Sequence, residues 1–211
     1  PALANRIIVS GGNVYAAGYA NNGSLDVATL WVNGTASSLS STTVTASVNA
    51  ASAYGLWVEG ATVYVSGFEG NGGFHSFCYW QNGVKYQMGT GSGEASKVKL
   101  FQGIRYAAGN QYNTSGYAVA RYYKNSTPVD LTDGTKNSAL VDIIVDQGIV
   151  YAVGVETNPQ KKLIVWKDSL RTELTDGTYT ANAGGLAVYN GWTYACATTY
   201  ETGSGKATYW V

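Results

Sequence analysis

Residues 14–18 read Val-Tyr-Ala-Ala-Gly, and four variants of this phrase return along the 211-residue chain. They are Val-Tyr-Val-Ser-Gly at 63–67, Arg-Tyr-Ala-Ala-Gly at 105–109, Val-Tyr-Ala-Val-Gly at 150–154 and, more loosely, Thr-Tyr-Ala-Cys-Ala at 193–197. Their tyrosines are separated by 49, 42, 45 and 43 residues. A period of this length is typical of proteins that repeat one small supersecondary unit. The chain therefore contains five units.

A second aromatic anchor lies 15 to 17 residues after each of these tyrosines. The second anchors are Trp31, Trp80, Tyr123, Trp166 and Trp210. A turn pair follows the first four: Asn33-Gly34, Asn82-Gly83, Asn125-Ser126 and Asp168-Ser169. Because Asn-Gly readily takes the positive φ of a type I′ turn, these pairs indicate a hairpin between a third and a fourth strand. Residues recurring in the same slot of every unit are expected to be core.

Short alternating runs separated by turn residues fill each unit, and no stretch has a helical period. In the fourth unit, strands are predicted at 143–145, 149–155, 163–166 and 172–174. Four short antiparallel strands per repeat are typical of a propeller blade. We therefore expect an all-β protein with one domain over 1–211, a five-bladed β-propeller of four-stranded antiparallel blades. The repeats are expected at about 7–55, 56–97, 98–142, 143–185 and 186–211.

The last repeat is short, because only Val211 follows Trp210. Ile7 to Val9 aligns with the first strand at 143–145, which leaves residues 1–6 as a linker. We expect a last blade that is incomplete, with three strands, or that is closed by the N-terminal segment. An open sheet edge also predicts a possible edge-mediated oligomer.

Three phrases resemble the repeats of bacterial surface-type five-bladed propeller proteins. They are Trp31-Val32-Asn33-Gly34 and Leu-Thr-Asp-Gly-Thr, which occurs at both 131–135 and 174–178. The resemblance implies an extracellular or cell-surface location. Five-bladed lectins of the tachylectin-2 type resemble the chain in blade count.

Composition argues against several partners and chemistries. Thirteen basic and thirteen acidic residues cancel, and only 12% of residues are charged, so we expect no nucleic-acid partner. No apolar run is long enough to predict membrane insertion. A single histidine and two cysteines make a metal site improbable, so we expect no metal and no cofactor.

Polar residues recur after the anchor glycines, where loops between second and third strands are expected. A carboxylate or amide stands two residues after the glycine at Glu69, Gln111 and Glu156, and four residues after it, or after its equivalent Ala197, at Asn71, Asn113, Asn158 and Glu201. Such groups on one rim could bind sugar hydroxyls, although Asn is also an ordinary turn residue. Trp57 and Trp192 fall outside the repeat pattern and are candidate surface aromatics that contact a partner.

These observations predict a non-catalytic extracellular binding module, lectin-like and multivalent, with a glycan ligand. A protein–protein interaction module or a structural propeller of a surface protein is the alternative. Five-bladed propellers also include glycosidases with paired acids. The acids of this chain form no distinguishing motif, so no catalytic residue is assigned and a glycoside hydrolase is the minor alternative.

Overall fold

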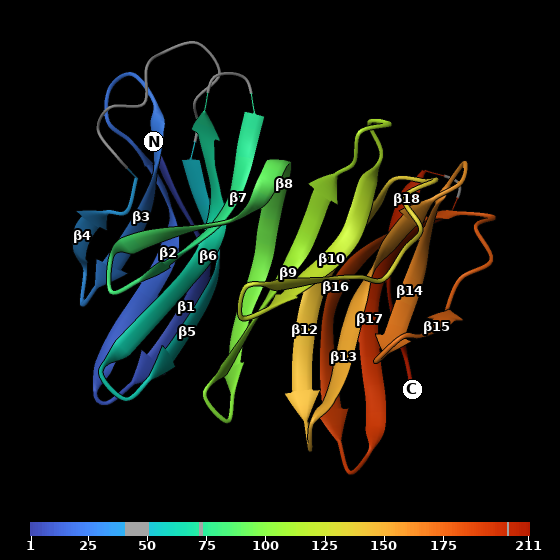
Figure 1. The fold of residues 1–211 in the computed structure, drawn as a ribbon. Coiled ribbons are helices and arrows are strands. Elements are labelled where there is room, and N and C mark those ends of the chain that lie inside the picture. The colour runs from blue at the N-terminus through green and yellow to red at the C-terminus, as the bar shows by residue number, and fades with distance from the viewer. Residues whose placement is uncertain (41–50, 72–73, 202) are drawn as a thin grey trace. The chain divides into compact units, whose positions relative to one another are not determined.

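A computed structural model of the chain describes residues 1–40, 51–71, 74–201 and 203–211. The described residues form eighteen β-strands and no helix (Figure 1). The prediction of an all-β protein is therefore confirmed. The chain divides into two compact units, Pro1–Leu100 and Phe101–Val211.

The N-terminal unit holds the first two repeats. Its strands are β1 (Ala2–Ser10), β2 (Asn13–Asn21), β3 (Asp26–Val32), β4 (Thr35–Ser38), β5 (Ala51–Glu59), β6 (Thr62–Asn71), β7 (Phe74–Gln81) and β8 (Val84–Phe101). Strands β1-β2-β3-β4 form one antiparallel sheet. Strands β5-β6-β7-β8 pair antiparallel in sequence order, and β8 is the longest described strand, with 18 residues.

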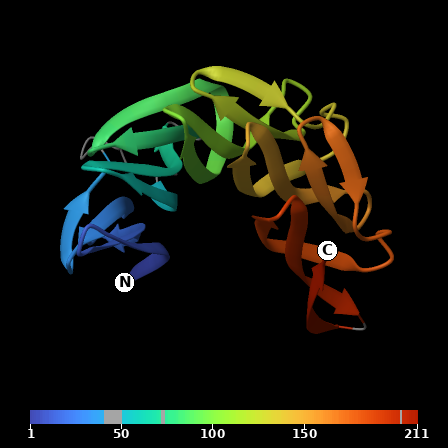
Figure 2. The same ribbon diagram turned by 90° about the horizontal axis from the view of Figure 1, so that it is seen from below.

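The C-terminal unit holds the remaining repeats. Its strands are β9 (Ile104–Tyr112), β10 (Ala118–Lys124), β11 (Thr127–Asp130), β12 (Ser138–Asp146), β13 (Ile149–Thr157), β14 (Lys161–Lys167), β15 (Leu170–Glu173), β16 (Thr180–Tyr189), β17 (Trp192–Glu201) and β18 (Ser204–Trp210). Strands β12-β13-β14-β15 form a four-stranded sheet, which confirms the four strands predicted for this repeat. The last sheet has three strands, β16-β17-β18, at the orange-to-red end of the colour scale in Figures 1 and 2.

The hairpins from third to fourth strand have the predicted left-handed turn residues. Asn33, Asn82, Asn125 and Asp168 all have φ between 49° and 54°. The side chain of each also accepts a hydrogen bond from a backbone N–H at the start of the second strand. These donors are Val14 (2.9 Å), Val63 (2.9 Å), Arg105 (3.1 Å) and Val150 (3.0 Å). Asn and Asp are favoured here because they tolerate positive φ and cap a neighbouring strand.

A β-bulge interrupts the first strand in four of the repeats. The register shifts lie between Ala4 and Arg6, Ala53 and Gly55, Leu140 and Asp142, and Ala183 and Gly185. The anchor glycine lies opposite the bulge, where backbone approaches closely. A Cβ on Gly154 would lie 2.1 Å from the carbonyl oxygen of Ala139, and Gly18 and Gly67 are equally crowded. In the first, second and fourth repeats the glycine is therefore a packing requirement at the bulge, whereas the fifth repeat has Ala197 in this position.

The bulge also explains two differences from the sequence-based expectations. The expected repeat starts at residues 7, 56, 98, 143 and 186 lie inside β1, β5, β8, β12 and β16. Residues 1–6 are no linker, because Ala2 to Ala4 pair with residues 18–20 of β2 and the Asn21 N–H donates to the Pro1 carbonyl at 2.8 Å. An extra residue shifts the two-residue alternation, so the parts of a strand before and after the bulge do not follow one continuous pattern.

A hydroxyl cap fastens the end of the fourth strand to the third. The backbone N–H groups of Ala28, Ala120 and Leu163 donate to the hydroxyls of Ser40, Thr132 and Thr175 at 2.9, 3.1 and 2.9 Å. The leucine before each hydroxyl residue donates its own N–H to the carbonyl of the same third-strand residue. This pair of bonds explains the recurring Leu-Thr or Leu-Ser dipeptide.

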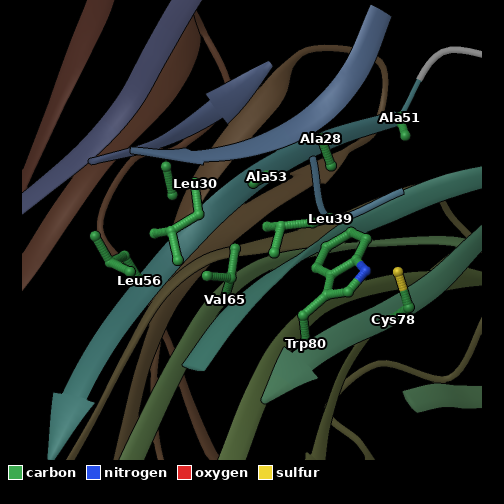
Figure 3. Close-up of a cluster of buried hydrophobic side chains, with 10 residues drawn as sticks. Ala28, Leu30, Leu39, Ala51, Ala53, Leu56, Val65, Cys78 and Trp80 are labelled. Atoms are coloured by element: carbon green, nitrogen blue, oxygen red, sulfur yellow. The ribbon is translucent and has the colours of Figure 1, made fainter. Parts of the chain in front are cut away.

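Apolar side chains from neighbouring repeats pack together within each unit. In the N-terminal unit, Trp80 and Cys78 of β7 lie beside Leu30, Leu56 and Val65 (Figure 3). In the C-terminal unit, a cluster around Tyr106 and Trp166 has the same role. Trp80, Tyr123 and Trp166 are fully buried, as predicted for the second anchors, whereas Trp31 and Trp210 are half-buried. Truncating a buried tryptophan of this kind costs about 3–5 kcal/mol.

Candidate functional site

Two grooves in the C-terminal unit are built around the same five-residue turn. Leu-Thr-Asp-Gly-Thr occupies 131–135 and 174–178, and a groove lies beside each copy. Asp133 accepts hydrogen bonds from the backbone N–H (2.9 Å) and hydroxyl (2.8 Å) of Thr135. Asp176 accepts from the Thr178 N–H at 2.8 Å. These donors lower the pKa of both aspartates, so each groove has a negative charge at its turn.

The groove at the first copy is lined by paired charges, and we call it the charged groove. The Glu156 carboxylate lies 3.0 Å from Arg171 Nη2 and 3.4 Å from Lys136 Nζ. Glu173 lies 2.8 Å from Arg171 Nη1 and 3.0 Å from Lys162 Nζ. Hydrogen bonds from Lys162 and Arg171 lower the pKa of Glu173. The groove has a volume of about 300 Å³ and is lined by Leu131, Thr132, Asp133, Lys136, Glu156, Arg171 and Glu173.

The groove at the second copy has a different lining, and we call it the aromatic groove. It has a volume of about 420 Å³ and is lined by Leu174, Thr175, Asp176, Tyr179, Thr199, Glu201, Lys206, Thr208 and Trp210. With the turns aligned, Tyr179 replaces Lys136 and Thr199 replaces Glu156. Thr199 pairs with Lys206 across β17 and β18, as Glu156 pairs with Lys162. Among the described residues Lys206 has no ion pair, so its ammonium is available to a ligand.

The aromatic groove combines groups that suit a polyhydroxylated ligand. Tyr179 is 44% exposed and Trp210 is half-buried, so both rings can be contacted. Around them stand the carboxylates of Asp176 and Glu201 and the ammonium of Lys206. Ligand sites commonly have volumes of about 300–1,000 Å³ and a few convergent polar groups beside apolar walls.

Three of the residues predicted to bind a ligand from the rim are buried in β-strands. Glu69, Gln111 and Glu156 are 3%, 2% and 8% exposed. Glu69 pairs with Lys85, and Gln111 accepts from Arg121 and from the Tyr123 hydroxyl. In these three repeats the second strand extends past the glycine, so these polar groups meet a neighbouring strand. The cation or phenol beside each offsets the cost of burial.

The residues predicted four positions after the glycine, or after Ala197, have different surroundings. Asn113 caps its own turn, accepting from the N–H groups of Ser115 and Tyr117 at 3.0 Å each, and donates to the Gly134 carbonyl at 2.8 Å. Asn158 is exposed after the end of β13. Asn71 ends β6, and its side chain lies outside the described part of the chain. Glu201 lines the aromatic groove.

The two tryptophans outside the repeat pattern lie in different units. Trp57 on β5 is half-buried, and the Lys99 ammonium lies 4.2 Å from the centroid of its ring. Trp192 is 63% exposed at the first residue of β17. Neither lines the aromatic groove. As ligand residues, sequence reasoning missed Asp176, Tyr179, Thr199, Lys206 and Trp210. The identical turns at 131–135 and 174–178 were the available signal.

The described residues contain neither a group of metal-binding side chains nor a membrane-spanning helix. Within residues 1–40, 51–71, 74–201 and 203–211, no three His, Cys, Asp or Glu side chains are grouped to hold a metal ion. No helix in those ranges is long and apolar enough to cross a membrane.

Comparisons with known proteins return distant structural likenesses. No family model matches the sequence, and no curated protein matches it significantly. Solved structures that are similar include a Trypanosoma rangeli sialidase in complex with sialic acid, at 9% identity and a TM-score of 0.36. That match covers 96% of this chain and 52% of the sialidase, so the chain spans about half its length. A GH43 endo-arabinanase from Bacillus licheniformis matches at 12% identity and a TM-score of 0.36, over 96% of this chain and 91% of the enzyme.

These comparisons correct the prediction of a non-catalytic, lectin-like module. The similar structures named above, a sialidase and an arabinanase, are glycoside hydrolases. The lectin prediction also depended on equivalent polar residues presented on one rim. Glu69, Gln111 and Glu156 are instead buried against strand neighbours, so the equivalent sites that multivalent binding requires are not formed there.

Proposed function

We propose that the chain is a carbohydrate-processing enzyme that binds its saccharide in the aromatic groove. The observation that carries the proposal is the meeting of two carboxylates, a lysine that forms no ion pair with any described residue and two accessible aromatic rings around one open groove. Sugar rings have apolar faces and polar edges. Tyr179 and Trp210 offer a surface to the faces, and Asp176, Glu201 and Lys206 offer hydrogen-bond partners to the hydroxyls.

The proposed reaction is hydrolysis of a glycosidic bond, which ordinarily uses two carboxyl groups. Glu201 protonates the leaving oxygen as its bond to the anomeric carbon breaks. Asp176 acts on the opposite side as a carboxylate. It serves there as the base that takes a proton from water while the water oxygen bonds to the anomeric carbon. Lys206 holds a hydroxyl of the sugar.

A hydrolysis assay tests this function. The protein is incubated with a panel of polysaccharides and aryl glycosides, and newly formed reducing ends are measured. On any substrate that is cleaved, Glu201→Gln and Asp176→Asn should each lower kcat by about 100-fold or more, because a general acid or base contributes that much.

Asp133→Asn is the matched control, because it changes the same turn in the charged groove. It should leave kcat unchanged. No cleavage across the panel by folded protein, or equal losses for Asp133→Asn and Asp176→Asn, would reject the proposed function.

We also propose that the five repeats are the blades of one five-bladed propeller. Support comes from the recurrence of the bulge, the Asn or Asp cap and the hydroxyl cap in successive repeats. A crystal structure that shows five sheets around one axis would agree, and any other count would not.

An extracellular or cell-surface location remains a proposal supported by the low proportion of charged residues. Fractionation of the source cells with an antibody to the chain tests it. Protein found only in the cytosol would contradict it.

A further inference from the structure

Three hairpin turns of the chain have the same sequence and the same backbone. Asn33-Gly34 joins β3 to β4, Asn82-Gly83 joins β7 to β8, and Asn190-Gly191 joins β16 to β17. The asparagines have φ of 50°, 49° and 49°, and the glycines have φ of 84°, 81° and 79°. All three asparagines are exposed. The turns therefore form a matched set in which the side-chain contacts of the asparagine can be compared.

The first two of these asparagines are held by the second strand of their own repeat. Asn33 Oδ1 accepts from the Val14 N–H at 2.9 Å, and Asn33 Nδ2 donates to Asn13 Oδ1 at 2.7 Å. Asn82 Oδ1 accepts from the Val63 N–H at 2.9 Å. These caps are available because each turn follows a third strand, which pairs with the second strand.

Asn190 lies in a different hairpin of its repeat, between the first and second strands. Its turn follows β16, which comes first in the order β16-β17-β18, as β12 does in β12-β13-β14-β15. A first strand pairs with the second strand alone, so no third element of the sheet lies beside the turn to bond to the asparagine. Among the described residues, the Asn190 side chain makes no hydrogen bond.

We propose that Asn190 is a site of spontaneous deamidation. The Gly191 backbone nitrogen, after losing its proton to hydroxide, bonds to Cγ of Asn190. The Cγ–Nδ2 bond breaks, and the nitrogen takes a proton from water and leaves as ammonia, which closes a five-membered succinimide ring. Water then adds to either ring carbonyl and breaks its bond to the ring nitrogen, which gives aspartate or isoaspartate. One water is consumed for each ammonia released, with no oxidation or reduction.

The caps at 33 and 82 should slow the first step. Ring closure requires the side-chain amide to turn toward the backbone nitrogen of the following glycine. At Asn33 and Asn82 this movement breaks hydrogen bonds to the second strand, whereas at Asn190 it breaks none among the described residues. The glycine itself offers no side chain to hinder the attack.

The product changes the charge of an exposed turn away from the aromatic groove. A carboxylate at position 190 would lie between the exposed side chains of Tyr189 and Trp192. Neither of these lines the aromatic groove, so the inference does not depend on the proposed hydrolysis.

Two further Asn-Gly pairs require a measurement that resolves single sites. Asn22 Oδ1 accepts from the N–H groups of Ser24 and Leu25 at 3.0 and 2.9 Å, so this side chain is also held. The pair at 71–72 extends outside the described residues.

Mass spectrometry of peptides from the aged protein tests the inference. The folded protein is incubated at mildly alkaline pH and digested at acid pH, and the acid formed at each asparagine is followed over time. Asn190 should deamidate at least about threefold faster than Asn33 and Asn82, because each cap is a hydrogen bond of ordinary strength. Rates at Asn33 or Asn82 that equal or exceed the rate at Asn190 would overturn the assignment.

The same experiment in guanidinium chloride separates structure from sequence. Unfolding removes the caps, so the three rates should converge. If Asn190 kept its full advantage in the unfolded chain, the preceding residues rather than the caps would set the order, and the inference would be wrong.

Gln147→Asn transplants the site to the fourth repeat. Gln147-Gly148 is the turn between β12 and β13, with φ of 51° and 85°, and corresponds to Asn190-Gly191. The new asparagine should deamidate at a rate close to that of Asn190 and above that of Asn82. Reaction at position 147 as slow as at Asn82 would contradict the role of the missing cap. Circular dichroism checks the fold of the variant, and the comparison within the wild type decides the matter if the variant is unfolded.

Discussion

The fourth and fifth repeats place different side chains around the same turn. In the fourth repeat, Glu156 and Arg171 meet beside the turn at 131–135, and paired charges line the groove. In the fifth, Thr199 stands at the position of Glu156, and no fourth strand is described that could supply a counterpart of Arg171. The groove at 174–178 has the larger volume, about 420 Å³ against about 300 Å³, and its Lys206 forms no ion pair with any described residue. One scaffold thus gives a structural ion-pair cluster in one place and a candidate site in another.

The largest effect should come from filling the space opposite the bulge. Gly154→Ala places a Cβ only 2.1 Å from the Ala139 carbonyl oxygen, so the backbone must shift, and we expect a loss of about 3 kcal/mol in the free energy of unfolding. Ala197 holds the same position in the fifth repeat, and Ala197→Gly should cost about 1 kcal/mol or less. Urea denaturation measures both. Similar losses of unfolding free energy for the two variants would show that the bulge of the fourth repeat does not require glycine more strongly than the bulge of the fifth.

Breaking the ion pairs of the charged groove should have the next largest effect. Arg171→Leu leaves the buried Glu156 carboxylate with only Lys136 among its described ion pairs, and we expect a loss of about 2 kcal/mol. Lys206→Leu changes a lysine of the aromatic groove and should stay within about 0.5 kcal/mol of the wild type. Urea denaturation again provides the values. Equal losses of unfolding free energy for Arg171→Leu and Lys206→Leu would mean that the ion pairs of the charged groove do not stabilise the fold.

Acid should destabilise the charged groove through Glu173. The pKa of Glu173 is lowered from its ordinary 4.5 by Lys162 and Arg171, so the folded state favours the charged form. That contribution is present above pH 4.5 and is lost as the pH falls below it through the folded-state pKa. Glu173→Gln should therefore flatten the fall of the melting temperature between about pH 5 and pH 3. If Glu173→Gln left the slope of melting temperature against pH unchanged, Glu173 would not be the group whose protonation lowers the stability.

The smallest effect should come from the two aspartates that the grooves share. Asparagine can accept the same hydrogen bonds from Thr135 or Thr178, so Asp133→Asn and Asp176→Asn should each shift the melting temperature by only about 1 °C. Differential scanning calorimetry detects such shifts. A clear difference between the two variants would show that the turns are not equivalent in stability.

The repeated elements of the fold were predictable because each depends on local chemistry. Asn33 and Asp168 mark their hairpins through positive φ, and the anchor spacing identifies buried tryptophans such as Trp80 and Trp166. The bulges were not predictable from alternation, because an extra residue reverses which side chains face the core. The segment Ala2 to Ala4 therefore had no strand pattern although it is part of β1.

The candidate site was predictable only in part, because its residues come from separate places in the chain. Glu201 was found from its spacing to the repeat. Asp176 and Tyr179 precede β16, whereas Lys206 lies on β18, and only the folded sheet brings them to one groove. Glu156 was expected on the surface because the strand was predicted to end at Val155. In the structure β13 continues to Thr157. Its partner Arg171, fifteen residues later, is the signal that a buried pair was possible.

The hydroxyl cap affects how a gene for such a repeat protein can be lengthened by duplication. Ser40, Thr132 and Thr175 each bond to a third strand of their own repeat, so the fastening of a fourth strand needs no residue from a neighbour. A recombination event that joins two copies just after the Leu-Thr dipeptide would carry this fastening intact. Duplication in steps of about 43 residues would then add whole, already secured modules to the reading frame.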